Sequence, residues 1–305
     1  MPKFIHVALV SVVLLFSCKQ AACYGQGRFL NSPDAYLGQT PPEEIPLIFA
    51  PGLLAGDGTF AIDRVAFSKE GKEIYYCTNT SWFSAKDLKV KYFRFDGKKW
   101  SGPAVLNEGF AAPCFAPGYR AMYFTGGGRR NVIWRSDKTA TGWSAPSAYL
   151  RKNYGVYDFM PTTSGNGYAG SNGTWGKYGD YSAWQFSLMP RFQTDTTIES
   201  LGSPPNAPGF NGDFYIAPDE SYMIVSADET KDFECELYIS FRKTDHSWTR
   251  PKSLGEKINR GPAHRFGVSV SPDGKYLFYT QGTSEKDCAI YWVRFDHLLK
   301  SLKKN

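Results

Sequence analysis

The stretch Ser269-Val-Ser-Pro-Asp-Gly-Lys-Tyr-Leu-Phe-Tyr-Thr280 decides the fold of this chain. It predicts a β-hairpin, in which a short strand runs into a tight turn at Pro272-Asp-Gly274 and a second strand of alternating aromatic and aliphatic residues follows. Proline presets the backbone angle at the start of such a turn, and glycine takes a backbone conformation that other residues resist. The stretch therefore indicates one unit of an antiparallel sheet.

The same hairpin pattern recurs along the chain. Good copies are Ala66–Tyr76, Cys114–Phe124 and Tyr215–Val225, and a degenerate copy is Thr162–Ser171. The copies follow one another at intervals of about 50 residues, and repeats of roughly 40–50 residues that each hold several short strands are typical of a β-propeller. The sequence therefore predicts an all-β fold built from repeated blades.

Each repeat continues with two further strands. The fourth begins with a Trp-x-x-Pro pattern at Trp100, Trp143 and Trp248, and proline suits the outermost strand because that strand is an edge. We expect these tryptophans to pack between blades; the alternative is a set of rings for stacking on sugars.

The fifth repeat lacks the fourth strand. After Phe295 it has only residues 296–304, which predict a short amphipathic C-terminal helix. The pattern of residues Pro46 to Leu54 predicts a strand with prolines at its margins. This strand can supply the missing fourth strand of the fifth blade, which would close the ring and remove the last free strand edge. We therefore expect five four-stranded blades closed by an N-terminal strand, with six blades as the alternative.

Composition excludes several classes of protein. The 305 residues carry a net charge of +6 and are 42% hydrophobic, so the chain can bury a large core and is only mildly basic. A nucleic-acid-binding surface would need clustered basic residues, which the sequence lacks apart from three lysines near its end. With four histidines and no Cys-x-x-Cys pair, no metal site and no cofactor are expected. We expect a monomer.

The N-terminus resembles an export signal. Lys3 precedes an apolar stretch, Phe4 to Phe16, which is too short for a comfortable membrane span. The stretch ends in Leu14-Leu-Phe-Ser-Cys18, which resembles a bacterial lipobox with Cys18 as the acylated residue; ordinary secretion is the alternative. The predicted division is a signal peptide at 1–17, a lipidated tether at 18–44 and a propeller domain at 45–305. The expected location is the bacterial outer membrane, on its periplasmic or its cell-surface side.

From residue 45 onward, the chain resembles the WD40-like repeat family called PD40, the TolB-like propellers, and in particular lipoprotein members of the Bacteroidetes type. The matching motifs are Ser271-Pro-Asp-Gly274, Ala217-Pro-Asp-Glu220, Leu237-Tyr-Ile-Ser-Phe-Arg242 with Trp248, and Leu254-Gly-Glu-Lys-Ile-Asn259. The resemblance implies a binding or scaffolding role without a shared catalytic set. The third repeat departs from the pattern, because Ala169 and Gly170 stand where large strand residues are expected.

Candidate ligand-binding residues lead into the innermost strands, whose ends line one mouth of a propeller channel. They are Asp63, Arg64, Tyr157, Asp158, Asn211, Asp213, His264 and Arg265. Polar groups that converge on a concavity are the default hypothesis for a binding site. The alternative is that they cap strand ends and solvate the channel.

The sequence leaves two functions open. The first is a membrane-anchored, non-catalytic propeller that binds an envelope protein or a glycan through the channel mouth. The second is a five-bladed carbohydrate-active hydrolase, in which two of Asp63, Asp158 and Asp213 act as acid and base, with a separation of roughly 5 Å or rather longer. No motif singles out a pair of these aspartates, and the sequence favours the first function, without enzymatic activity.

Overall fold

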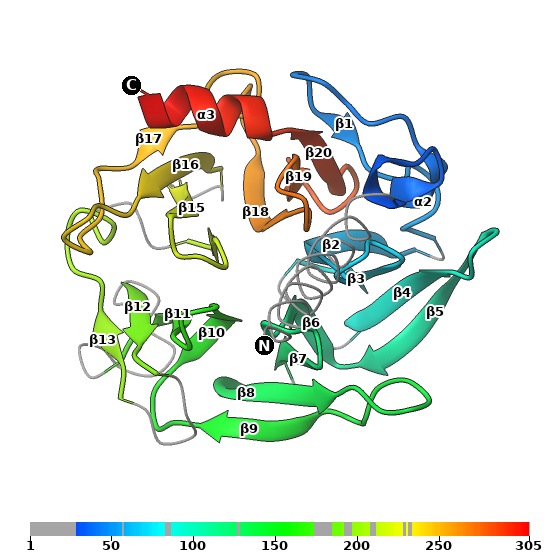
Figure 1. Cartoon of the computed structure of the whole chain (residues 1–305), viewed down its shortest axis with the longest axis horizontal. Coiled ribbons are helices and arrows are strands. Elements are labelled where there is room, and N and C mark those ends of the chain that lie inside the picture. Colours follow the sequence, from blue (N-terminus) through cyan, green and yellow to red (C-terminus); the bar gives the residue numbers. More distant parts are fainter. Residues whose placement is uncertain are drawn as a thin grey trace, which may run out of the picture.

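The computed structural model of the chain describes residues 29–56, 58–82, 87–126, 129–173, 185–191, 197–207, 212–227, 230 and 234–304. Within these residues, five four-stranded antiparallel sheets stand around a common centre as the blades of a β-propeller (Figure 1). The predicted five-bladed all-β fold is confirmed, and the alternative of six blades is wrong.

Blades 1 to 4 follow the chain outward from the centre. Blade 1 consists of β2 (Phe60–Phe67), β3 (Glu73–Asn79), β4 (Lys89–Phe95) and β5 (Trp100–Glu108). Blade 2 consists of β6 (Phe110–Phe115), β7 (Ala121–Gly126), β8 (Arg129–Asp137) and β9 (Ser147–Arg151). Blade 3 consists of β10 (Val156–Pro161), β11 (Gly167–Ser171), β12 (Gln185–Met189) and β13 (Glu199–Ser200). Blade 4 consists of β14 (Phe214–Ile216), β15 (Tyr222–Ala227), β16 (Glu236–Phe241) and β17 (Lys252–Ser253).

Blade 5 takes its strands from both ends of the chain. Its inner strands are β18 (His264–Val270), β19 (Tyr276–Gly282) and β20 (Ala289–Arg294), and its outermost strand is β1 (Leu47–Ile48). In the register of this pair, Leu47 lies opposite Trp292 and Ile48 opposite Tyr291. The predicted closure by an N-terminal strand is therefore confirmed.

The predicted turns join the first two strands of each blade. In blade 5, the N–H of Ser271 donates to the carbonyl of Tyr276 at 2.9 Å, and Gly274 has a φ of 72°. In blade 4, Ala217 bonds Tyr222 in the same way at 2.9 Å, but Glu220 takes the glycine position with a φ of 61°. A left-handed conformation is costly for a side chain of this kind, so Glu220 must be stabilised by its contacts.

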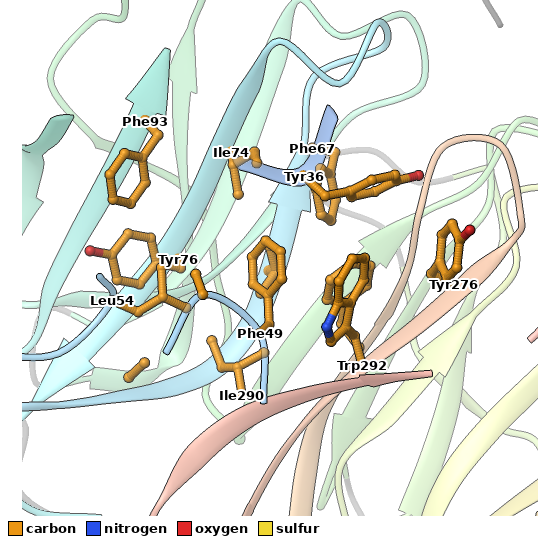
Figure 2. Packing of buried hydrophobic residues seen from close by; sticks show 14 of the residues in the cluster. Tyr36, Phe49, Leu54, Phe67, Ile74, Tyr76, Phe93, Tyr276, Ile290 and Trp292 are labelled. Atoms are coloured by element: carbon orange, nitrogen blue, oxygen red, sulfur yellow. The ribbon is translucent and has the colours of Figure 1, made fainter. Parts of the chain in front are cut away.

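The hydrophobic core lies in the seams between neighbouring blades. Figure 2 shows the seam between blades 5 and 1, where Phe49 of the closing segment packs edge-on against Trp292, with ring centroids 5.2 Å apart. The side chain of Tyr36, 1% exposed, lies between Phe67 and Tyr276 in the same cluster. The N-terminal segment therefore completes this seam as well as the outer edge of blade 5.

Part of the predicted tether belongs to this core. Residues 29–44 form a short 3-10 turn, η1 (Phe29–Asn31), and a helical turn, α2 (Ala35–Gly38), and they bury Leu30, Ala35 and Tyr36. The expectation of a free tether up to residue 44 is therefore corrected for these residues. A few well-placed apolar side chains are enough to hold a segment that shows no hydrophobic periodicity. Residues 1–28, including Cys18, lie outside the described residues.

Two of the three predicted tryptophans, Trp143 and Trp248, pack between blades, whereas Trp100 packs on the N-terminal segment, where its indole N–H donates to the carbonyl of Asp34 at 2.7 Å. The indole N–H of Trp143 in blade 2 donates to the hydroxyl of Tyr75 in blade 1 at 2.8 Å. Trp248 of blade 4, 4% exposed, packs against Tyr168 of blade 3 with ring centroids 6.5 Å apart.

The predicted C-terminal helix is also confirmed. It is α3 (Asp296–Lys304), whose Leu298, Leu299 and Leu302 pack on the seam between blades 4 and 5. None of the helices in the described part of the chain has the length and apolar character that a membrane crossing requires.

Candidate functional site

The innermost strands bulge toward the centre of the ring at equivalent positions. The strand register shifts in β2, β6, β10 and β18. At these bulges Asp63, Ala112, Asp158 and Gly267 take positive φ values of 66°, 51°, 51° and 61°. A bulge inserts an unpaired residue that bends the strand and re-aims its neighbours.

Two of these bulges nearly touch. A Cβ atom placed on Gly267 would lie 2.6 Å from the Cα atom of Asp63, so only glycine fits at this point of blade 5. The hydroxyl of Thr280 in blade 5 also donates to the carbonyl of Asp63 at 2.9 Å. The backbones of blades 5 and 1 are therefore in close contact at this point.

A cluster of charged residues fills the centre at the level of the bulges. Arg64 of blade 1 forms an ion pair with Asp158 of blade 3, with Nη2 and Oδ1 separated by 3.2 Å and side chains 3% and 7% exposed. Asp213 of blade 4 accepts a hydrogen bond from the backbone N–H of Gly267 in blade 5 at 3.1 Å. We call Asp63, Arg64, Asp158 and Asp213 the channel cluster. Its residues come from blades 1, 3 and 4, and their hydrogen bonds reach the backbone of blade 2 at Ala112 and of blade 5 at Gly267.

Burial is the main cause of a raised pKa at two acids of the channel cluster, Asp158 and Asp63. Burial raises the pKa of Asp158 well above its ordinary value; the negative charge of Asp213 adds to this rise, and Arg64 opposes it. Burial likewise raises the pKa of Asp63 to about 6, opposed by Arg64 and assisted by Asp213. Asp158 is also hydrogen-bonded to Asp213. The cluster therefore retains protons that isolated aspartates would release.

The structure brings four of the predicted site residues together in this cluster. The others lie elsewhere. The hydroxyl of Tyr157 donates to the carbonyl of Gly212 at 2.9 Å, and its ring lies directly over Gly170, where a Cβ would come within 2.1 Å of the ring. The small residue in the third repeat thus makes room for a tyrosine that joins blade 3 to blade 4. Asn211 lies outside the described residues.

Arg265 supports a loop. It is 1% exposed, and its guanidinium donates to the carbonyls of Ile258 at 3.1 Å, Arg260 at 2.7 Å and Gly261 at 2.8 Å. It also donates to the side chain of Gln281 at 3.1 Å. These partners belong to blade 5 and to the loop that precedes it, and none belongs to the channel cluster.

His264 lies at the start of β18. Its ring is 5.5 Å from that of Trp82 in blade 1 and 4.4 Å from that of Phe266, measured between centroids. Its Nδ1 lies 3.5 Å from the sulfur of Cys235. His264 is half-buried and so remains accessible at this end of the ring.

Sequence reasoning missed the buried carboxylate of Glu220. This side chain, in a residue 3% exposed, accepts hydrogen bonds from Thr162 at 2.6 Å, Asn166 at 3.0 Å and Tyr168 at 2.9 Å, all of blade 3, and forms an ion pair with Arg242. The sequence signal was a glutamate in the turn position that glycine usually takes. Its contacts show that it connects blades 3 and 4.

Two pockets lie at the seams between blades. One of about 330 Å³ is lined by residues of the closing segment and of blades 4 and 5, among them Ile45, Lys257, Arg260 and Tyr291. Another of about 310 Å³ lies between the turns of blades 1 and 2. Neither is lined by the channel cluster. In the described part of the chain, no group of three or more histidine, cysteine, aspartate or glutamate residues is placed to hold a metal ion.

The geometry of the cluster suits a structural role, in which it connects blades, better than hydrolysis. A glycosidase needs an acid and a base on either side of a bound sugar, with room for the sugar between them. Here Asp158 is 5% exposed, ion-paired with Arg64 and hydrogen-bonded to Asp213, so these carboxyl groups contact protein partners.

Comparison with known proteins finds similar solved structures at low identity. No family model matches the chain, and no curated protein matches it. Among solved structures it is similar to TolB from Acinetobacter baumannii, at 13% identity and a TM-score of 0.45 over 75% of this chain and 53% of that one. It is also similar to a putative TolB from Agrobacterium tumefaciens (16% identity, TM-score 0.39, 63% of this chain and 62% of that one). Kuenenia stuttgartiensis hydrazine synthase is similar at 14% identity and a TM-score of 0.39, over 72% of this chain and 63% of that one. The chain spans less than two thirds of the length of each of these three.

Proposed function

We propose that the chain is an exported, lipid-anchored and non-catalytic β-propeller that binds a protein or glycan partner at the bacterial cell envelope through its channel mouth. The observation that supports a non-catalytic role is the channel cluster. Its carboxyl groups, which a hydrolase would need, contact one another and Arg64. A PD40-like propeller of the Bacteroidetes lipoprotein type, which the repeat motifs resemble, would have such a binding role, and an anchor at Cys18 agrees with the lipobox-like sequence.

The binding surface that we assign to this function is the channel mouth at His264, together with Asp63 and Asp213. These three side chains are only partly buried, whereas Arg64 and Asp158 are buried. A partner would therefore contact the first three and leave the ion pair intact. Polar groups at a concave mouth, next to the ring of Trp82, suit a ligand that combines hydrogen-bonding groups with a flat surface.

Site-specific photo-crosslinking in the native envelope tests this function. A photoreactive amino acid replaces His264 in one variant and Val105, an exposed residue on the outer strand of blade 1, in the control. We expect an adduct of defined mass from position 264 only, and we expect Asp213→Asn to weaken it. Equal labelling at the two positions, or a discrete glycan-cleaving activity that Asp213→Asn abolishes, would contradict the proposal.

A further inference from the structure

Exposed aliphatic side chains are concentrated on the segment that closes the ring. The described residues have five exposed large hydrophobic side chains, and four of them lie within residues 45–53: Ile45 (61% exposed), Leu47 (49%), Ile48 (42%) and Leu53 (50%). The fifth, Val105, lies on β5 of blade 1. Single exposed aliphatic residues are ordinary, but a contiguous group marks a surface that contacts something. We call the four residues the closing-strand patch.

The patch lies on a well-packed segment. Phe49 and Leu54, from the same stretch of chain, are 1% and 4% exposed and pack into the seam between blades 5 and 1 (Figure 2). β1 is the outermost strand of its sheet and lies at the periphery of the ring (Figure 1). The patch therefore lies along the outer edge of blade 5, with Leu47 and Ile48 on opposite faces of the edge strand, on a backbone that the core holds in place.

Basic side chains lie on the same side of the ring as the patch, and two of them, Lys257 and Arg260, line a pocket together with Ile45. α3 lies along the same side of the ring as β1 (Figure 1), and its leucines pack inward while Lys300, Lys303 and Lys304 are exposed. Lys257, from the loop before blade 5, pairs with Glu44 at 2.5 Å. The acidic groups of this rim are Glu43, Glu44, Glu256 and Asp296, and Asp296 is paired with Arg294. A side of the molecule that carries both exposed aliphatic residues and basic residues has the composition of surfaces that contact anionic lipid.

The N-terminal chain approaches from the same flank. Phe29 packs against Phe95 with ring centroids 4.7 Å apart, and the residues after it join the core cluster that contains Phe49. If Cys18 is acylated, which rests on the proposed function, the stretch from Cys18 to Phe29 spans at most about 40 Å. A lipid at Cys18 would thus keep the bilayer within reach of this rim.

We infer that the closing-strand patch docks the propeller edge-on against a lipid bilayer that contains anionic lipid. Ile45, Leu47 and Ile48 enter the interfacial layer, and the lysines of α3 lie at the level of the head groups. The contact is small, so it is weak and reversible by itself and acts together with the lipid anchor. Edge-on docking leaves the channel mouths facing sideways, where a partner can reach them.

Vesicle flotation tests this inference. The mature chain, residues 18–305, with Cys18→Ser, which removes any acyl group, is mixed with vesicles of phosphatidylethanolamine and phosphatidylglycerol. We expect it to float with the vesicles, and we expect Ile45→Ser, Leu47→Ser and Ile48→Ser together to lower the bound-to-free ratio at least about tenfold, since each aliphatic side chain loses apolar burial. The matched control, Val105→Ser, removes an equally exposed aliphatic residue from another blade and is expected to leave the ratio unchanged. Equal thermal unfolding of the variants checks that the fold is intact.

Three results would overturn the inference: no flotation of the Cys18→Ser chain, equal losses in the triple variant and the control, or a dimer in light scattering that the triple variant converts to a monomer. The last would make the patch an interface between two copies. Labelling of Cys18 with a radioactive fatty acid in cells tests the anchor separately. A chain that floats but takes up no label would retain the patch while refuting the anchored function.

Discussion

The channel cluster predicts an unusual dependence of stability on pH, which Asp63→Asn isolates. Asparagine keeps the shape of the side chain and tolerates the left-handed φ of 66°. Its side-chain oxygen can still accept the hydrogen bond that the N–H of Arg64 donates to Asp63 at 2.8 Å. The substitution therefore removes the titration of Asp63 with little other change.

The raised pKa of Asp63 decides whether the unfolding free energy rises or falls with pH. Folding raises this pKa from 3.8 to about 6, so the native chain retains a proton that the unfolded chain releases. The stabilisation is present below about pH 4 and is lost as the pH rises through about 6. A shift of about two pKa units corresponds to about 3 kcal/mol. Asp158, whose pKa is also raised by burial, acts in the same direction.

Urea unfolding of the wild type and the variant, at a series of pH values between about 4 and 8, measures the effect. The unfolding free energy of Asp63→Asn relative to wild type should rise by about 3 kcal/mol across this range, because only the wild type loses the proton-linked stabilisation. Asp245→Asn is the control: Asp245 is an exposed turn residue whose pKa is lowered by its hydrogen bonds with Ser247, so its titration lies below this pH range and its difference curve should be nearly flat. Parallel curves of unfolding free energy against pH for wild type and Asp63→Asn would show that Asp63 is ionised in the native channel. The claim that the folded cluster raises the pKa of Asp63 would then be wrong.

Three further substitutions test the contacts between blades, each by urea unfolding. Gly267→Ala should lower the unfolding free energy by about 3 kcal/mol, because the new Cβ meets the backbone of Asp63. Gly274 has a similar positive φ but nothing within 4 Å, so Gly274→Ala should lower it by only about 1 kcal/mol. Equal losses in the two variants would refute the close approach. Glu220→Gln should cost about 3 kcal/mol by breaking a buried ion pair, and a loss below about 1 kcal/mol would show that the pair is solvated. Trp143→Phe should cost about 1 kcal/mol by removing one hydrogen bond between blades 1 and 2, and an unchanged midpoint would contradict that bond.

The fold was predictable because its signals are local. A turn such as Pro272-Asp-Gly274 with its flanking strands specifies a hairpin without reference to the rest of the chain, and five copies at similar spacing specify a ring. Closure by β1 was predictable from the strand that the last repeat lacks. The packing of Tyr36 was not, because one aromatic side chain in a polar segment has no periodicity to reveal it.

The candidate site was predictable only in part, because the bulges set which side chains reach the centre. Sequence reasoning treated Asp63-Arg64 and His264-Arg265 as equivalent pairs. The bulges instead make Gly267 the counterpart of Asp63, so Arg265 falls before the bulge and supports a loop. The number of residues in a bulge depends on how neighbouring backbones meet, and a single sequence does not contain that information.

The position of Arg64 shows why such a cluster suits a closed ring. The hydrophobic clusters lie in the seams, and each seam ties a blade to its neighbour. Arg64 of blade 1 reaches Asp158 of blade 3, which is not its neighbour, and Asp213 of blade 4 bonds the backbone of blade 5. A buried ion pair adds little net stability compared with apolar packing, but one unpaired buried charge is expensive. The Arg64–Asp158 ion pair therefore forms only when blades 1 and 3 stand at the correct distance from the axis, so it favours one ring geometry over others that the seams alone would permit.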